Sequence, residues 1–259
     1  MPRFAANLTM MFNEVPFLER FGAARRAGFQ GVEFLFPYDF PADAIRAELH
    51  RHELTMALFN MPAGDWAKGD RGLACHPNAV QQCRDGLRAA VEYAEALGCR
   101  QLHLMAGIRP AGASEEAMRE TYLANVRYAA KELAARGMTL LVEAINTRDL
   151  PGFYVNTSRQ ALELMDAAGE PNVRFQYDVY HMQIMEGDLA KTLERHIARI
   201  GHIQIADPPA RHEPGTGEIN YPFLFDRIDR LGYSGWIGCE YKPTGRTEDG
   251  LGWMRKWIM

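Results

Sequence analysis

The sequence lacks the features that mark secreted or membrane proteins. Its four cysteines are widely spaced and form no CxxC pair, so neither a zinc site nor a disulfide framework is indicated, and we expect reduced, mostly buried thiols. No run approaches the roughly 18 apolar residues of a transmembrane helix, and the first residues show no signal-peptide pattern. We therefore expect a cytoplasmic protein with no membrane partner.

The sequence also lacks an excess of charge. The formal net charge is −4 and the pI is near 6.1, a mildly acidic balance that disfavours nucleic acid as a partner. The hydrophobic content of 47% is ordinary for a globular protein. The length of 259 residues suits one large α/β barrel or two small domains.

Short apolar runs alternate with longer amphipathic segments along the whole chain. We expect strands at Phe4–Leu8, Gly31–Leu35, Thr55–Asn60, Gln101–Met105, Thr139–Glu143, Val173–Asp178, His202–Ala206 and Trp236–Glu240. A doubly wound open sheet would need a glycine-rich phosphate turn after its first strand, and the chain has none there. With no linker or composition break, the pattern predicts one (β/α)₈ TIM barrel over residues 1–259.

Local signals also place some helices. Ser114, followed by two glutamates, is expected to begin a long helix. Thr157 and Gln160 have the spacing of a capping box at the start of another.

Four polar residues each end one of the later apolar runs: Glu143, Asp178, Gln204 and Glu240. Their spacing is about that of a strand plus a crossover helix. Because parallel strands of a barrel end at one face, these side chains should converge where barrel active sites lie. Buried carboxylates repel each other unless a cation lies among them, and no Lys or Arg occupies these strand ends.

The oxygen donors of this set predict which cation binds. Carboxylate and amide oxygens suit Mg²⁺ or Mn²⁺ better than zinc. His181 follows Asp178 by one helical turn and should reach the same cavity, as an outer or substrate-binding group rather than a ligand. Other strand ends carry Asn7, Glu33 and Asn60.

Several segments resemble those of the hydroxypyruvate isomerase family, which includes closely similar 2-oxo-tetronate isomerases, among the xylose-isomerase-like barrels. The segments are spread over most of the chain: Phe34–Asp39, Pro62–Trp66, Gln204–Asp207, Pro214–Tyr221 and Gly238–Pro243. The resemblance implies that Glu143, Asp178, Gln204 and Glu240 bind one divalent cation. It also implies that Glu143 and Glu240 are the catalytic proton donor and acceptor.

The implied reaction moves hydrogens between adjacent carbons of a 2-oxo-3-hydroxy acid through an enediolate, as between hydroxypyruvate and tartronate semialdehyde. A substrate carboxylate needs a cationic partner, and Arg211 is a better clamp than Lys242 because a guanidinium binds in a bidentate way. We also expect Asn7 and Trp66 at the substrate. Residues 60–77, which contain Trp66, have the position of a lid that excludes water.

Other functions remain open on sequence alone. A ketose 3-epimerase, or another sugar isomerase of the superfamily, would use the same two carboxylates on a neutral sugar. A zinc-dependent abasic-site endonuclease would need more histidines at the strand ends, and a non-catalytic sugar-acid binding protein would not need the two carboxylates beside a cation. The substrate's chain length is undetermined, and so is the number of subunits, with a homo-oligomer among the alternatives.

Overall fold

The computed structural model describes residues 1–257, whose strands form a closed barrel in chain order. The strands are β1 (Arg3–Asn7), β2 (Gly31–Phe34), β3 (Thr55–Asn60), β4 (Gln101–His103), β5 (Thr139–Glu143), β6 (Val173–Asp178), β7 (Ile200–Ile205) and β8 (Trp236–Cys239). All neighbouring pairs are parallel, and β1 pairs with β8 to close the ring. The predicted (β/α)₈ TIM barrel is confirmed.

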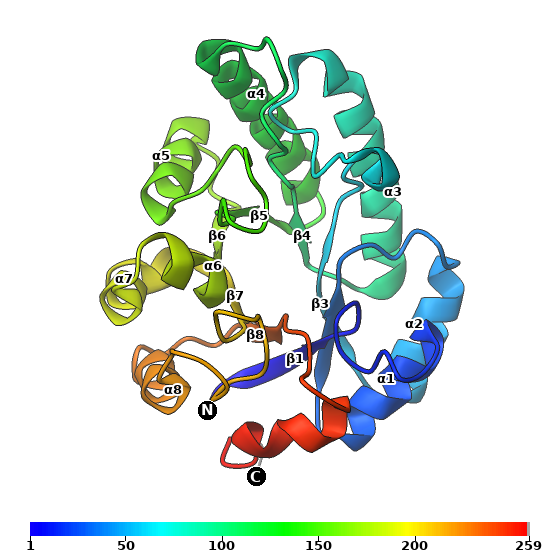
Figure 1. The fold of residues 1–259 in the computed structure, drawn as a ribbon. Helices are drawn as coiled ribbons and strands as arrows, with labels where there is room; N and C mark the ends of the chain where they lie inside the picture. The colour runs from blue at the N-terminus through cyan, green and yellow to red at the C-terminus, as the bar shows by residue number, and fades with distance from the viewer. Residues whose placement is uncertain (258–259) are drawn as a thin grey trace.

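The helices surround this barrel, as Figure 1 shows. They are α1 (Phe17–Arg26), α2 (Ala42–Arg51), α3 (Val80–Leu97), α4 (Glu115–Ala134), α5 (Ser158–Ala168), α6 (Val179–Met185), α7 (Leu189–His196) and α8 (Tyr221–Arg230), with short 3₁₀ helices η1 (Trp66–Lys68), η2 (Pro77–Ala79), η3 (Ile197–Arg199) and η4 (Thr247–Met254). Their apolar faces cover the outer surface of the strands, where the main core lies. None of the helices described has the length and apolar composition to cross a membrane.

The strand predictions differ from the structure mainly at the ends. β3, β5 and β6 have the predicted bounds, whereas β4 ends at His103, before the predicted Met105. The chain turns away there because Ala106 forms an antiparallel bridge with Gly72 in the loop after β3. β7 begins earlier than predicted, at Ile200.

The predicted helix starts are present. The Ser114 hydroxyl accepts a hydrogen bond from the backbone N–H of Ala117 at 3.1 Å. The Thr157 hydroxyl accepts one from Gln160 at 3.2 Å, but the Gln160 amide oxygen accepts from Asn156 N–H rather than from Thr157. The reciprocal half of this capping box is therefore displaced by one residue.

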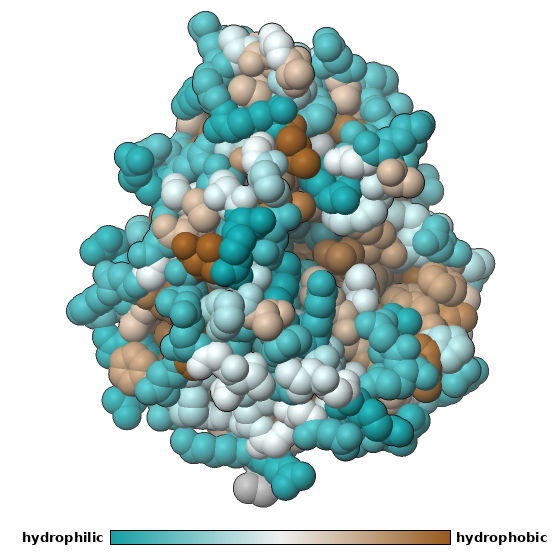
Figure 2. All heavy atoms as spheres, in the orientation of Figure 1, coloured by the Kyte–Doolittle hydropathy of each residue, from teal (hydrophilic) through white to brown (hydrophobic). Residues whose placement is uncertain are grey.

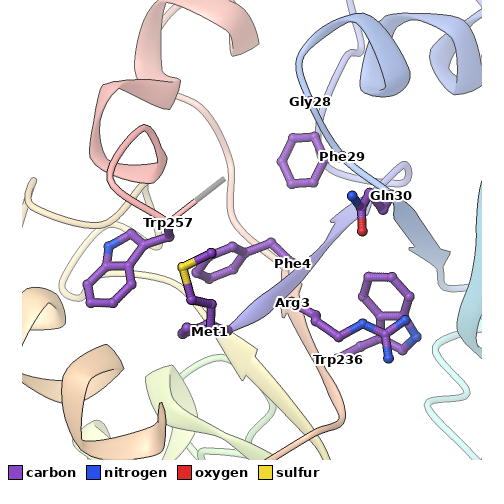
Figure 3. A pocket seen from close by; sticks show the side chains of 9 residues that line it. Met1, Arg3, Phe4, Gly28, Phe29, Gln30, Trp236 and Trp257 are labelled. Carbon is purple, nitrogen blue, oxygen red and sulfur yellow. The ribbon is translucent and has the colours of Figure 1, made fainter. Parts of the chain in front are cut away.

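A small apolar group lies inside the barrel at its N-terminal end. There Trp236 packs with Ala5 and Ala57 as a small separate cluster. The guanidinium of Arg3 lies over the Trp236 ring, 4.0 Å from its centroid, in a cavity of about 330 Å³ between the two ends of the described chain (Figure 3). This cavity lies at the strand starts, at the opposite end of the barrel from the predicted active site.

Candidate active site

A second cavity, of about 150 Å³, lies at the C-terminal ends of the strands. It is lined by Met10, Leu35, Asn60, Trp66, Met105, Glu143, Ile145, Asp149, Leu150, Gln176, His181, Arg211 and Glu240. Its volume equals that of about five molecules of liquid water, which admits only a small ligand. Figure 2 shows this face, hollowed near its centre, where hydrophobic side chains lie between hydrophilic ones.

Strand register places the polar side chains of β5, β6 and β7 in two successive pairs. Glu143 on β5 lies opposite Gln176 on β6, and Asp178 lies opposite Gln204 on β7. Successive side chains of a strand alternate between its two faces, so polar residues two apart both point inward while their neighbours face the helices. The strand ends therefore meet at one end of the barrel, as predicted, but Gln204 does not line the cavity.

Three of the four predicted cation ligands are strongly buried carboxyl groups. Glu143, Asp178 and Glu240 are 5%, 1% and 5% exposed. Burial, together with the negative charges of Glu240 and Asp178, raises the pKa of Glu143 well above its usual value. Burial also raises the pKa of Glu240 to about 8, against the lowering effect of Arg211. The cavity therefore carries more acidic groups than its own cations neutralise.

Asp178 connects the barrel to the next helix. Because α6 starts at the following residue, its Oδ1 caps that helix by accepting from the N–H groups of Tyr180 at 2.8 Å and His181 at 3.3 Å. Its Oδ2 is buried and has no hydrogen-bond partner among the described residues. An ionised oxygen in that state is costly unless a cation binds it.

Arg211 corrects the expectation that no cationic side chain reaches the strand ends. It comes from the loop after β7, and its Nη2 lies 2.6 Å from Glu240 Oε2 and 3.7 Å from Asp178 Oδ2. The sequence predicted Arg211 at the substrate, and it lines the cavity, but its contacts with Glu240 and Asp178 were not predicted because Arg211 is outside the strand. An ion-pair cluster with one guanidinium is thus part of the site.

The loop that carries Arg211 folds around Asp207. This buried carboxylate accepts hydrogen bonds from the backbone N–H groups of Gly215, Gly217 and Ile219 at 2.9–3.0 Å. Arg211 itself has the left-handed backbone conformation, with φ of 61°, and such a residue persists only when its surroundings hold it. The motif Gln204–Asp207 therefore positions the arginine.

Gln204 belongs to a polar network below the cavity rather than to its lining. Its Nε2 donates to Glu33 Oε1 at 2.9 Å, and its Oε1 accepts from Gln176 Nε2 at 2.7 Å. Glu33 also binds Asn7 Nδ2 at 3.0 Å and the ring Nε2 of His202 at 2.6 Å. Asn7, predicted at the substrate, lies in this network and also donates to Glu240, at 3.4 Å.

The remaining predicted substrate residues separate into two groups. His181 and Trp66 line the cavity, and burial with the charge of Arg211 lowers the pKa of His181 well below its usual value. Lys242 is exposed and lies in the wall of a neighbouring cavity. Trp66 is 42% exposed and stacks with Arg71, whose guanidinium lies 3.9 Å from its ring centroid.

The segment 60–77 is only partly free to act as a lid. Gly72 N–H donates to Ala63, and Cys75 N–H donates to Ala106, while residues 73–75 are buried. A side chain at Gly72 would overlap the backbone of Met105. The exposed part is the turn at residues 65–69, which contains η1.

Several residues of the site were missed by sequence reasoning. His103 ends β4 and lies 3.5 Å from Glu143, but the predicted strand continued beyond it. Asn146 and Asp149 lie in the loop after β5, where no regular pattern identifies them. Gln176 is two residues before Asp178 on β6. Because side chains alternate along a strand, Gln176 faces the same side as Asp178, and this pattern could have identified Gln176 from the sequence.

Comparison with known proteins agrees with this architecture. Residues 21–257 match the family model described as xylose isomerase-like TIM barrel. A 2-oxo-tetronate isomerase from Cupriavidus necator is 52% identical over 258 residues, covering 100% of this chain and 99% of that protein. A hydroxypyruvate isomerase from Escherichia coli is 50% identical over 254 residues, covering 98% of each chain.

A solved structure from Brucella melitensis, described as an AP endonuclease of family 2, is 53% identical, with a TM-score of 0.97 over 99% of both chains. The fold and the convergent carboxylates define a xylose isomerase-like TIM barrel enzyme. Within that class, the chain belongs to the family of hydroxypyruvate isomerases and 2-oxo-tetronate isomerases, and it is an isomerase.

Proposed function

We propose that the chain interconverts a small 2-oxo-3-hydroxy acid and its isomer through an enediolate, with the help of one divalent cation. The substrate is hydroxypyruvate, which yields tartronate semialdehyde, or a 2-oxo-tetronate. The observation that carries the proposal is a cavity of about 150 Å³ with two buried carboxyl groups, Glu143 and Glu240, in its wall. The names of the relatives support the same substrate class.

The residues present fit a hard cation. Glu143, Asp178 and Glu240 supply carboxylate oxygens. Gln204 lies opposite Asp178 on β7, and its amide oxygen accepts one hydrogen bond from Gln176, which leaves a second lone pair for a cation. Asp178 Oδ2 has no hydrogen-bond partner among the described residues, and burial together with neighbouring carboxylates raises the pKa values of Glu143 and Glu240. These four residues would hold Mg²⁺ or Mn²⁺. When bound, the cation would stabilise negative charge that develops on the substrate oxygens.

Glu143 and Glu240 would transfer the proton. One carboxylate takes the proton from the hydroxyl-bearing carbon beside the carbonyl group, and the proton returns to the former carbonyl carbon, while the hydroxyl proton moves between the two oxygens. Such general acid–base catalysis contributes about 10²–10⁴-fold. The raised pKa of Glu240 in its buried position favours a group that can hold a proton near neutral pH.

Three other side chains would orient the substrate. Arg211 lies at the cavity wall and can bind a substrate carboxylate while remaining close to Glu240. His181 can hydrogen-bond an oxygen of the reacting carbons. Trp66 would cover the opening and exclude water from the enediolate.

Proton NMR in D₂O tests the proposal. Metal-stripped enzyme is given hydroxypyruvate or a 2-oxo-tetronate, each with EDTA and with added Mg²⁺ or Mn²⁺. We expect cation-dependent conversion and deuterium incorporation at the carbon next to the carbonyl group, and the relative rates identify the substrate. Absence of turnover of both acids with cation present would contradict the proposal.

Two controls address the alternative enzymes. A neutral ketose that is consumed faster than either acid would indicate an epimerase. Cleavage of DNA at an abasic site with added zinc would indicate the activity in the description of the Brucella structure. In the described part of the chain, His181 is the one histidine that lines the cavity, which disfavours a site with several zinc ions.

A further inference from the structure

His181 has a defined hydrogen-bonding partner on the side of its ring that faces away from the carboxylates. Its Nδ1 lies 2.6 Å from Nδ2 of Asn146, and both residues are almost completely buried. Its Nε2 points to the carboxylates, 3.4 Å from Asp178 Oδ2 and 3.8 Å from Glu143 Oε1. The hydrogen position on this ring decides what His181 can do at the substrate.

The orientation of the Asn146 amide is determined by Asp149. The Asn146 oxygen accepts a hydrogen bond from the backbone N–H of Asp149 at 2.7 Å, and its Nδ2 donates to the Asp149 carboxylate at 3.2 Å. The reversed amide would place an NH₂ group against the N–H and an oxygen against the carboxylate. Both contacts would be repulsive, so Nδ2 must face His181.

Asp149 is in turn held in place by Tyr180. The Tyr180 hydroxyl donates to Asp149 Oδ2 at 2.8 Å. The chain of contacts from Tyr180 through Asp149 to Asn146 therefore has one consistent assignment of donors and acceptors.

Because Asn146 presents a donor, Nδ1 of His181 must be the acceptor and carry no hydrogen. The hydrogen of the neutral ring is then on Nε2, the nitrogen that faces the cavity. Glu143, Asp178 and His181 offer atoms within 4.8 Å of one another, a spacing that a metal could use. A histidine ligand needs an unprotonated nitrogen, however, and Nε2 does not provide one.

We propose that Asn146 is a positioning residue that fixes His181 in the Nε2–H tautomer. His181 then donates a hydrogen bond to the substrate oxygen that gains negative charge, and it is excluded from the cation's ligands. This role rests on the isomerase activity proposed above, whereas the tautomer itself does not. A donor aimed at developing charge stabilises the transition state more than the bound substrate.

The tautomer can be observed without turnover. In metal-free protein labelled with ¹⁵N-histidine, long-range ¹H–¹⁵N correlation spectra distinguish a protonated ring nitrogen from an unprotonated one. His181→Gln identifies the signals of His181 among the eight histidines. We expect hydrogen on Nε2 alone in the wild type, and a mixture with Nδ1–H in Asn146→Leu, whose side chain is similar in size and has no donor. A wild-type spectrum with hydrogen on Nδ1, or a folded Asn146→Leu protein with hydrogen on Nε2 alone, overturns the proposal.

Kinetics test the consequence. Asn146→Leu should lower kcat by about 10–100-fold with a smaller change in KM. The same substitution in a His181→Gln background should have a much smaller effect, because glutamine has no tautomers. Asn78→Leu makes the same change at an exposed position and should leave kcat unchanged. Equal effects of Asn146→Leu in both backgrounds would contradict the role of His181.

The two arms separate the possible failures. If His181 has hydrogen on Nε2 but neither acid is converted, the tautomer is confirmed and the proposed function is wrong. His181 would then donate a hydrogen bond to a ligand of another class. Thermal unfolding of Asn146→Leu shows whether the variant folds. If it does not fold, the wild-type spectrum still decides the tautomer.

Discussion

The guanidinium of Arg211 lies 2.6 Å from the carboxylate of Glu240 and thereby joins the loop after β7 to the end of β8. Arg211 Nε also donates to the Glu240 backbone carbonyl at 3.3 Å, and the N–H of Lys242 donates to the Arg211 carbonyl. The pair therefore has both an electrostatic and a structural role. Its guanidinium offsets part of the negative charge that a bound cation would otherwise balance alone.

Replacing Arg211 should weaken both substrate binding and folding. Arg211→Ala leaves Glu240 buried without its partner, and we expect a loss of about 3–5 kcal/mol of unfolding free energy in the metal-free enzyme. Added Mg²⁺ should restore part of this loss because it supplies positive charge. Urea denaturation with EDTA or Mg²⁺ measures both values, and KM for the 2-oxo acid should rise. Arg159→Ala, at an exposed and loose ion pair, is the control and should change stability by less than about 0.5 kcal/mol.

Neutralising either catalytic carboxyl group should remove activity and keep the fold. Glu143→Gln or Glu240→Gln should lower kcat at least about 10²-fold, since an amide cannot exchange the proton. Stability of the metal-free protein should be unchanged or higher in Glu143→Gln, because the substitution removes repulsion between buried acids. Glu240→Gln also breaks the ion pair with Arg211 and should lower stability. Steady-state kinetics and thermal unfolding check this. Glu163→Gln on the exposed side of α5 should match the wild type, and a Glu143→Gln variant with full activity would remove Glu143 from the mechanism.

The buried thiols should be inert in the folded protein. Burial raises the pKa of Cys75 and Cys99 to about 12 and that of Cys83 to about 11, so almost no thiolate is present at pH 8. We expect negligible reaction with a thiol-specific disulfide reagent at that pH, and reaction of all four cysteines in denaturant. Rapid modification of a thiol in native protein would contradict the buried positions.

The same thiols give a pH dependence of stability. In the unfolded chain they lose protons near pH 8.5, whereas the folded protein holds them to higher pH. The unfolded state thus binds fewer protons in that range, and the free energy of unfolding falls as pH rises from about 8.5 towards about 12. Below pH 8.5 this contribution is fully present. Denaturant titrations of the wild type and of Cys83→Ser, whose slope against pH should be shallower, measure it.

Gly238 on β8 is expected to tolerate no side chain. A Cβ at this position would overlap the carboxylate of Glu33. Gly238→Ala must therefore displace Glu33 and should cost at least about 1–3 kcal/mol, the usual range for overpacking a core. Thermal unfolding measures the change. Gly252→Ala, where nothing lies within 4 Å of the added carbon, is the matched control and should be close to neutral.

The sequence predicted the barrel because parallel strands covered on both sides have a distinctive apolar pattern, and β5 and β6 were predicted to the residue. It predicted Glu143 and Asp178 at the site because each ends a strand. It missed the contact of Arg211 with Glu240, since that contact depends on the path of a loop folded around Asp207. Such paths are set by tertiary hydrogen bonds, which leave no periodic signal in the sequence.

Glu33 on β2 links β1 to the distant strand β7, because Asn7, His202 and Gln204 all bind its carboxylate. A change at any one of these positions would have to be matched at the others before the protein could fold well. Stepwise adaptation of the barrel interior is therefore obstructed. Single substitutions in the exposed turn that carries Trp66 do not have this constraint. New substrate preferences in this scaffold should accordingly arise by loop exchange over a constant interior, and libraries for directed evolution should be built there.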